Sequence, residues 1–119
     1  MDKLDIREVE GPGGVAVIEL SGALTLGSLF EFQDATRREW KNGLILALGE
    51  VVYMDSAGLG AILGLFAASQ RKGTGFALAE VGRRVMTLLE VSKVDGLVPR
   101  YGSVDEAAAA LGTSGQRRN

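Results

Sequence analysis

The chain has 119 residues, a net charge of −2, and neither cysteine nor histidine. The length suits one domain, and the missing residue types exclude disulfides, thiolate sites and a Ser-His-Asp triad. Nucleic acid is not expected as a partner, because the basic cluster at 117–118 is only two arginines. No apolar run reaches the roughly 18 residues of a membrane span, and the charged N-terminal segment lacks the apolar core of a signal peptide. We therefore expect a cytoplasmic protein without membrane insertion.

The first predicted elements are a hairpin and a helix. Residues 4–9 alternate apolar and charged side chains, as a half-exposed strand does. The glycine-rich turn at 11–14 then leads into a returning strand at 15–20. A capping-box spacing at Ser28 opens a helix that we expect to end at the Asn-Gly pair at 42–43. The residues that recur at helical spacing are Leu29, Phe32, Thr36 and Trp40.

The rest of the chain alternates strands and helices. Residues 44–48 form a continuous apolar run, typical of a strand buried on both faces, and 51–54 form a brief extended segment. Helices are expected at 56–72, 82–91 and 103–111, and strands at 76–79 and 97–101. This order predicts a single α/β domain at 1–111, with a mixed, mostly parallel β-sheet of four to five strands and about four helices. Residues 112–119 have no apolar anchor and are predicted to be a disordered tail.

The most informative stretch is the strand-to-helix junction at 53–60. Ser56 is placed to cap the helix by accepting a hydrogen bond from a free backbone N–H. The same position can carry function, because the unpaired N–H groups and the dipole of a helix N-terminus tolerate a phosphate. A phosphate on Ser56 would add about two negative charges beside Asp55, which would repel a partner built for a neutral surface. The two interpretations do not exclude each other.

The helix at 56–72 has two distinct faces. Its predicted core face consists of Leu59, Ile62, Leu63 and Phe66. The opposite face consists of Ala57, Gly60, Ala61, Gly64 and Ala68. Gly60 and Gly64 each cost about 1 kcal/mol relative to alanine in a helix interior. They serve either close packing within the chain or a flat docking surface that runs down the helix from Ser56.

Motifs for enzymes and cofactors are not fulfilled. A nucleophile elbow requires glycine two residues before the serine, where Met54 stands. Gly58, Gly60 and Gly64 miss the dinucleotide-binding spacing by one residue. Asp55 has no second carboxylate at a spacing that would hold a metal. The sequence predicts no enzyme, no cofactor and no metal, and favours a binding or switching module.

The segment 54–64 reads MDSAGLGAILG and resembles the switch segment of STAS domains, in particular the stand-alone anti-sigma-factor antagonists. An Asp-Ser-x-Gly-Leu-Gly pattern preceded by an aromatic and an apolar residue is fairly specific. The resemblance extends from the strand end at 20–24, through 44–48, to the closing helix at 103–111, and so covers nearly the whole chain.

The resemblance implies a function and a set of site residues. The unphosphorylated protein would bind an anti-sigma factor that is also a serine kinase, and would thereby free a sigma factor for transcription. The kinase, using ATP and magnesium, would phosphorylate Ser56 and end binding, and a serine phosphatase would reset the cycle. Gly58 and Gly60 would permit close approach of the partner. The partner-binding residues are then Asp55, Ala57, Gly58, Gly60, Gly64 and Thr25.

Three positions depart from the family pattern. Many relatives have aspartate at the position of Thr25 and aspartate or asparagine at that of Ala47, and in the family these groups flank the switch serine. Their loss weakens the case for the kinase contact more than the case for the fold. Ala57 replaces a frequent second hydroxyl, which leaves Ser56 as the one phosphoacceptor of the segment.

Other functions stay open at this stage. The first is a constitutive scaffold of the same fold, a subunit of a transporter or signalling complex without a phosphate cycle, which Thr25 and Ala47 favour slightly. The second, an enzyme or nucleotide-binding domain, is disfavoured by the missing histidines and the failed glycine spacings. A homodimer through an exposed aromatic residue such as Phe30 is also left open.

Overall fold

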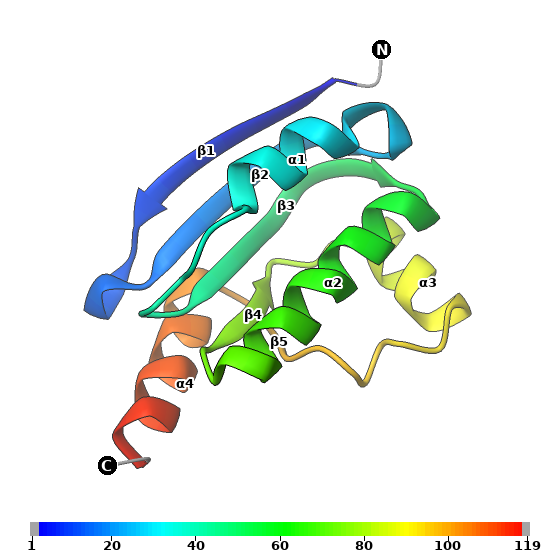
Figure 1. Cartoon of the computed structure of the whole chain (residues 1–119). Coiled ribbons are helices and arrows are strands. Elements are labelled where there is room, and N and C mark those ends of the chain that lie inside the picture. The colour runs from blue at the N-terminus through cyan, green and yellow to red at the C-terminus, as the bar shows by residue number, and fades with distance from the viewer. Residues whose placement is uncertain (1–2, 118–119) are drawn as a thin grey trace.

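The computed structural model describes the backbone of residues 3–117 and the side chains of residues 3–112. Five strands form one sheet in the order β1-β2-β3-β4-β5, in which β1 is antiparallel to β2 and the other neighbours are parallel (Figure 1). The strands are β1 (Leu4–Glu10), β2 (Ala16–Leu24), β3 (Leu44–Met54), β4 (Phe76–Ala79) and β5 (Arg100–Tyr101). The helices are α1 (Leu29–Thr36), α2 (Ser56–Lys72), α3 (Arg83–Val91) and α4 (Val104–Arg117). The predicted α/β class, the hairpin and the mixed, mostly parallel sheet are confirmed.

The helices cover the sheet on both sides. Each of α1, α2 and α3 connects neighbouring parallel strands that advance in one direction across the sheet, and right-handed connections of this kind place all three helices on the same face. Helix α4 follows the last strand and covers the other face. The sheet is thus the middle layer of three, with α1 and α2 lying side by side in front of it (Figure 1).

Strand β3 shows how the sequence builds the two cores. Successive side chains of a strand point to opposite faces, so a strand buried on both faces must be apolar throughout. Leu44, Leu46 and Leu48 join the core beneath α1, α2 and α3. Ile45 and Ala47 join the smaller core beneath α4. The prediction of a doubly buried strand is confirmed, but β3 continues without a break to Met54, where we expected a separate extended segment.

Helix α1 is shorter than predicted. It ends at Thr36, whose hydroxyl donates to the Phe32 carbonyl, and the indole N–H of Trp40 donates to the Thr36 carbonyl. The predicted end at 42–43 was therefore wrong, and Trp40 lies in the following loop. The predicted capping box is also wrong, since Ser28 makes no side-chain capping bond to α1.

The last helix begins as predicted and extends further. Ser103 accepts a hydrogen bond from the N–H of Glu106 at 3.1 Å, which confirms the cap at its start. Helix α4 continues to Arg117, so residues 112–117 are helical where we predicted a disordered tail. The remaining residues of that tail, 118–119, lie outside the described residues.

Candidate functional site at the start of helix α2

The junction between β3 and α2 lies at the edge of the sheet where β2 and β3 both end. These strands are parallel, with Leu24 opposite Met54, so the residues that follow them meet in space. The N–H of Asp55 donates to the Leu24 carbonyl at 3.3 Å. The chain therefore enters α2 directly beside the turn that leads into α1.

Asp55 joins these two segments. One carboxylate oxygen, Oδ1, accepts the N–H of Gly58 at 3.0 Å, which makes Asp55 the N-cap of α2. The other, Oδ2, accepts the N–H of Leu26 at 3.1 Å in the turn after β2. The prediction that Ser56 caps the helix is thus wrong, because Ser56 is the first residue inside the helix.

The same contacts set the charge state of Asp55. Desolvation by burial acts to raise the pKa of this carboxyl, but the backbone N–H groups of Gly58, Leu26 and Ala57 favour the charged form. Their combined effect lowers the pKa of Asp55 below its usual value. The site therefore carries a fixed negative charge at neutral pH.

Replacing Asp55 tests its joining role. Asp55→Ala is expected to lower the free energy of unfolding by about 1–2 kcal/mol, because α2 loses its cap. Asp55→Asn keeps a neutral acceptor and should lower the free energy of unfolding by less.

The stabilisation by Asp55 should also depend on pH. A carboxyl whose pKa is lowered by folding stabilises the protein above its unfolded-state pKa of about 3.9 and loses that contribution as the pH falls through the folded-state pKa. The difference in free energy of unfolding between the wild type and Asp55→Asn, measured with urea, should accordingly become smaller from neutral pH to about pH 2. A difference in free energy of unfolding that stays constant with pH would contradict a role for the charge of Asp55.

Ser56 is exposed and its hydroxyl is not used by the fold. Because Asp55 caps α2, the hydroxyl is not needed as a cap, and it makes no hydrogen bond within the part of the chain that the structure describes. A partner can therefore reach the Ser56 oxygen without disturbing the domain.

The three glycines of α2 have different roles. A Cβ on Gly58 would lie 2.3 Å from the Leu24 carbonyl oxygen, so Gly58 is buried against the end of β2 and serves internal packing. Gly58 therefore lies beneath the surface on which we predicted it. Gly60 and Gly64 are exposed, and a Cβ on either would meet no heavy atom within 4 Å. Close packing within the chain therefore does not explain Gly60 and Gly64.

Thr25 and Ala47 are also placed differently from the expectation. Thr25 is buried, and its hydroxyl accepts the N–H of Gly27 at 3.2 Å, so it shapes the turn after β2 and does not face a partner. The side chain of Ser28 completes a reciprocal cap there by accepting the N–H of Thr25 at 3.0 Å. Ala47 is buried beneath α4, about 23 Å along β3 from Met54, and does not flank Ser56.

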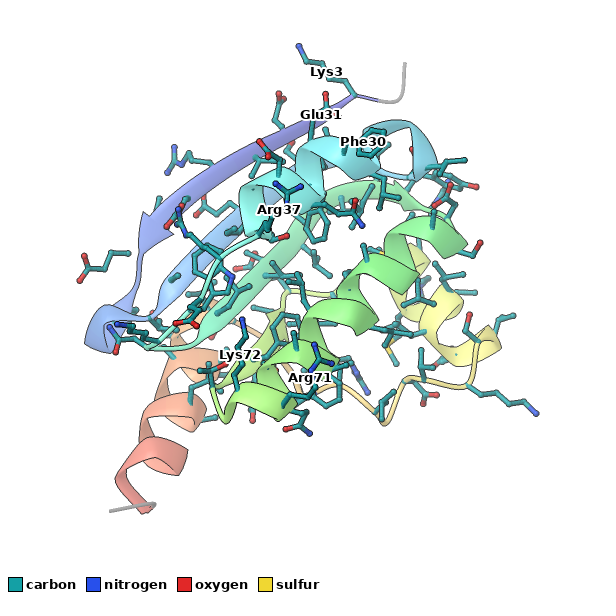
Figure 2. The ribbon with its side chains drawn as sticks, in the orientation of Figure 1. Lys3, Phe30, Glu31, Arg37, Arg71 and Lys72 are labelled. Carbon is teal, nitrogen blue, oxygen red and sulfur yellow. The ribbon has the colours of Figure 1, made fainter. Side chains whose placement is uncertain are left out.

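Two exposed apolar side chains lie in and just after the turn that Asp55 contacts. Leu26 is 70% exposed and Phe30 is 85% exposed. Phe30 projects from the first turn of α1 (Figure 2). The backbone N–H of Leu26 is bound by Asp55, which holds the residue beside the start of α2. Sequence analysis did not single out Leu26, because its exposure results from the turn that Thr25 caps.

A groove runs beside Ser56 between α1 and α2. Its walls include three of the predicted surface residues, Ala57, Gly60 and Gly64, together with Phe32 and Leu65. The structure therefore brings together Asp55, Ser56, Ala57, Gly60 and Gly64 on or beside one accessible surface, and it places Gly58 and Thr25 beneath that surface.

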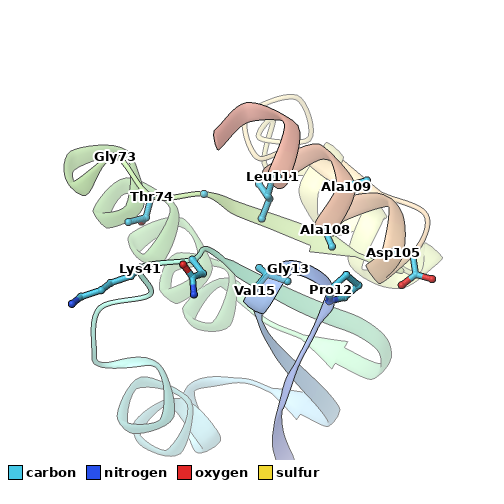
Figure 3. Close-up of a pocket in the computed structure, with 13 residues that line it drawn as sticks. Pro12, Gly13, Val15, Lys41, Gly73, Thr74, Asp105, Ala108, Ala109 and Leu111 are labelled. Atoms are coloured by element: carbon cyan, nitrogen blue, oxygen red, sulfur yellow. The ribbon is translucent and has the colours of Figure 1, made fainter. Parts of the chain in front are cut away.

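Another hollow lies at the opposite edge of the sheet, near the β1–β2 turn (Figure 3). Leu111 and Ala108 of α4 form one wall, while Lys41 and Asp105 lie on different sides of it (Figure 3). Its charged groups do not converge on one point. Among the described residues, no three carboxylates are placed to hold a metal ion, and no helix is both long and apolar enough to cross a bilayer.

Comparison with known proteins establishes the family. The model of the STAS domain family matches residues 7–107, which lie within the predicted domain at 1–111. The chain belongs to the STAS domain family. An anti-sigma F factor antagonist from Paenibacillus polymyxa is 31% identical to this STAS protein over 108 residues, which make up 87% of this chain and 92% of that protein. The family that segment 54–64 indicated is thus confirmed.

Solved structures share the fold of this STAS domain. An anti-sigma-factor antagonist (STAS) domain protein from Planctomyces limnophilus superposes with a TM-score of 0.77 at 22% identity, covering 90% of this chain and 97% of that one. The anti-sigma factor antagonist SpoIIAA in its unphosphorylated form gives a TM-score of 0.72 at 17% identity, covering 87% and 92%. At these identities the likeness supports the STAS fold alone.

Proposed function

We propose that this STAS protein is an anti-sigma-factor antagonist whose binding is switched by phosphorylation of Ser56. The observation that carries the proposal is the exposed Ser56 hydroxyl, which the fold does not use because Asp55 caps the helix. The names of the relatives support the antagonist role. In the unphosphorylated state the protein binds an anti-sigma factor serine kinase and frees a sigma factor, and it acts as a binding protein in the cytoplasm.

The phosphate cycle follows ordinary phosphoryl transfer. The Ser56 oxygen attacks the γ-phosphorus of ATP held with magnesium by the kinase, a base of the kinase takes the hydroxyl proton, and ADP leaves. A serine phosphatase later hydrolyses the phosphoserine and returns the hydroxyl and inorganic phosphate. The antagonist supplies only the acceptor, so it needs no cofactor of its own.

The switch acts through charge and leaves the fold in place. The phosphate sits at the positive end of the α2 dipole, so the folded domain tolerates it. It adds about two negative charges to a surface that already holds the charged Asp55. A kinase surface that fits the neutral hydroxyl is repelled by that charge, and the complex dissociates.

The test is phosphate transfer with purified components. The partner kinase with ATP and magnesium is expected to place one phosphate on the wild type at Ser56, located by mass spectrometry, and none on Ser56→Ala. The neighbouring serine and threonine hydroxyls are inaccessible, because Thr25 and Ser28 are buried. Phosphate on Ser56→Ala at the same rate as on the wild type would refute Ser56 as the acceptor.

The alternative is a constitutive scaffold, and the same proteins separate the two functions. A scaffold would hold its partner whether Ser56 is serine, alanine or aspartate. Ala47 no longer favours this alternative, because its side chain lies in the core beneath α4 and away from Ser56. A homodimer through the exposed Phe30 stays a separate proposal, which the sedimentation behaviour of the wild type and of Phe30→Ser would test.

A further inference from the structure

The groove between α1 and α2 extends well beyond the switch serine. Two hollows lie along α2. One, lined by Ala57 and Gly60 near Ser56, separates α2 from α1, and the other, lined by Lys72 and Trp40, lies between the end of α2 and the loop that follows α1. They share Thr36, Arg37 and Leu65 as lining residues and so form one continuous groove. From Gly60 to Lys72 the groove follows α2 for about 18 Å.

The two ends of the groove differ in chemistry. Near Ser56 the walls are mostly small or apolar, with Ala57, Gly60, Ala61 and Leu29 among them, and Arg37 is the one charged residue among the described residues that line this hollow. At the far end the charged lining residues are Arg37, Arg38 and Lys72, and no acidic residue lines either hollow. Figure 2 shows Arg37 at the end of α1 and Lys72 at the end of α2. This end of the groove is basic, although the chain as a whole has a net charge of −2.

The cations at this end differ in their partners. Arg37 pairs with Asp34 at 3.2 Å, and Arg38 pairs with Glu8 and lies over the Trp40 ring. Lys72 is exposed and forms no ion pair with any of the described residues. Lys72 is therefore the cation of the groove whose charge is left for a partner.

We propose that this groove seats an amphipathic helix of the anti-sigma factor kinase. The apolar face of that helix lies on Gly60, Gly64 and Leu65, and its carboxylates lie beside Lys72. Helix-in-groove docking suits a trough that follows α2, and the missing side chains of Gly60 and Gly64 let another helix approach closely where α1 forms the opposite wall. The length of the groove accommodates about three helical turns. The inference rests on the proposed antagonist function and adds the surface and the partner's chemistry to it.

The test reverses the unpaired charge. Lys72→Glu is expected to weaken binding of the purified anti-sigma factor kinase about tenfold at low salt, because it replaces an attraction with a repulsion. The difference should shrink as ionic strength rises, since exposed charges are screened. Arg84→Glu on α3 makes the same change in net charge away from the groove and should bind like the wild type. Urea unfolding of both variants checks that each is folded.

A charge exchange identifies the partner helix directly. Hydrogen exchange on the kinase locates the helix that becomes protected in the complex. Replacing an acidic residue of that helix with lysine should restore affinity for Lys72→Glu while weakening binding to the wild type. If Ser56→Asp ends binding but Lys72→Glu and the wild type bind equally well, the groove is not the docking site although the proposed function stands. A wild type that binds no such kinase would overturn both.

Discussion

Gly58→Ala is expected to lower the free energy of unfolding by about 3 kcal/mol, at the upper end of the range for overpacking. The added Cβ would lie 2.3 Å from the Leu24 carbonyl oxygen and 2.9 Å from the Leu24 Cγ. The oxygen belongs to the backbone at the end of β2, where the Leu24 carbonyl also accepts the N–H of Asp55, so it cannot move aside cheaply. The variant must therefore lift α2 away from the sheet.

Gly60→Ala is the matched control for this change. The substitution lies in the same helix, but no heavy atom comes within 4 Å of the new Cβ, so it should raise the free energy of unfolding by up to about 1 kcal/mol. Urea unfolding monitored by circular dichroism compares the two variants with the wild type. Equal effects of the two substitutions would contradict the packing of Gly58 against β2.

Ser56→Asp is expected to weaken binding of the anti-sigma factor kinase about a hundredfold. A carboxylate buried in an interface without a partner costs about 3 kcal/mol, which corresponds to that factor. The fold should be nearly unaffected, because a negative charge in the first turn of α2 interacts favourably with the helix dipole. Lost binding therefore cannot be attributed to unfolding.

Thr87→Asp provides the control for added charge. Thr87 lies on the exposed side of α3, so this variant has the same net charge as Ser56→Asp but leaves the switch surface intact. Calorimetric titration of the kinase should give wild-type affinity for Thr87→Asp. A similar loss in both variants would show that the kinase senses total charge instead of the charge at position 56.

Much of the fold was predictable because the local pattern decides it. The apolar run at 44–48 can only be buried on both faces, and it proved to be the central strand of the sheet. The helix at 56–72 was predicted with its observed bounds, because its apolar face and the glycine at 73 are local signals. The end of α1 was missed because it depends on the bond from Trp40 to the Thr36 carbonyl, which the helical spacing of these residues conceals.

The segment that forms the site was predictable, but the roles of its individual residues were not. Asp55 and Ser56 are both good helix caps, and the choice of Asp55 depends on its second bond to Leu26, a contact 29 residues away in the chain. Gly58 and Gly60 read alike in the sequence, and only the contact with Leu24 separates a packing glycine from an exposed one. Long-range contacts of this kind leave no local pattern.

The most direct test of the switch compares one protein in two chemical states. The wild type is phosphorylated by the kinase with ATP and magnesium, purified away from it, and titrated with fresh kinase beside the unphosphorylated protein. We predict tight binding of the unphosphorylated form, binding at least about a hundredfold weaker for the form phosphorylated at Ser56, and full recovery after treatment with a serine phosphatase. Equal affinity of the two forms would contradict the switch and would favour a constitutive scaffold.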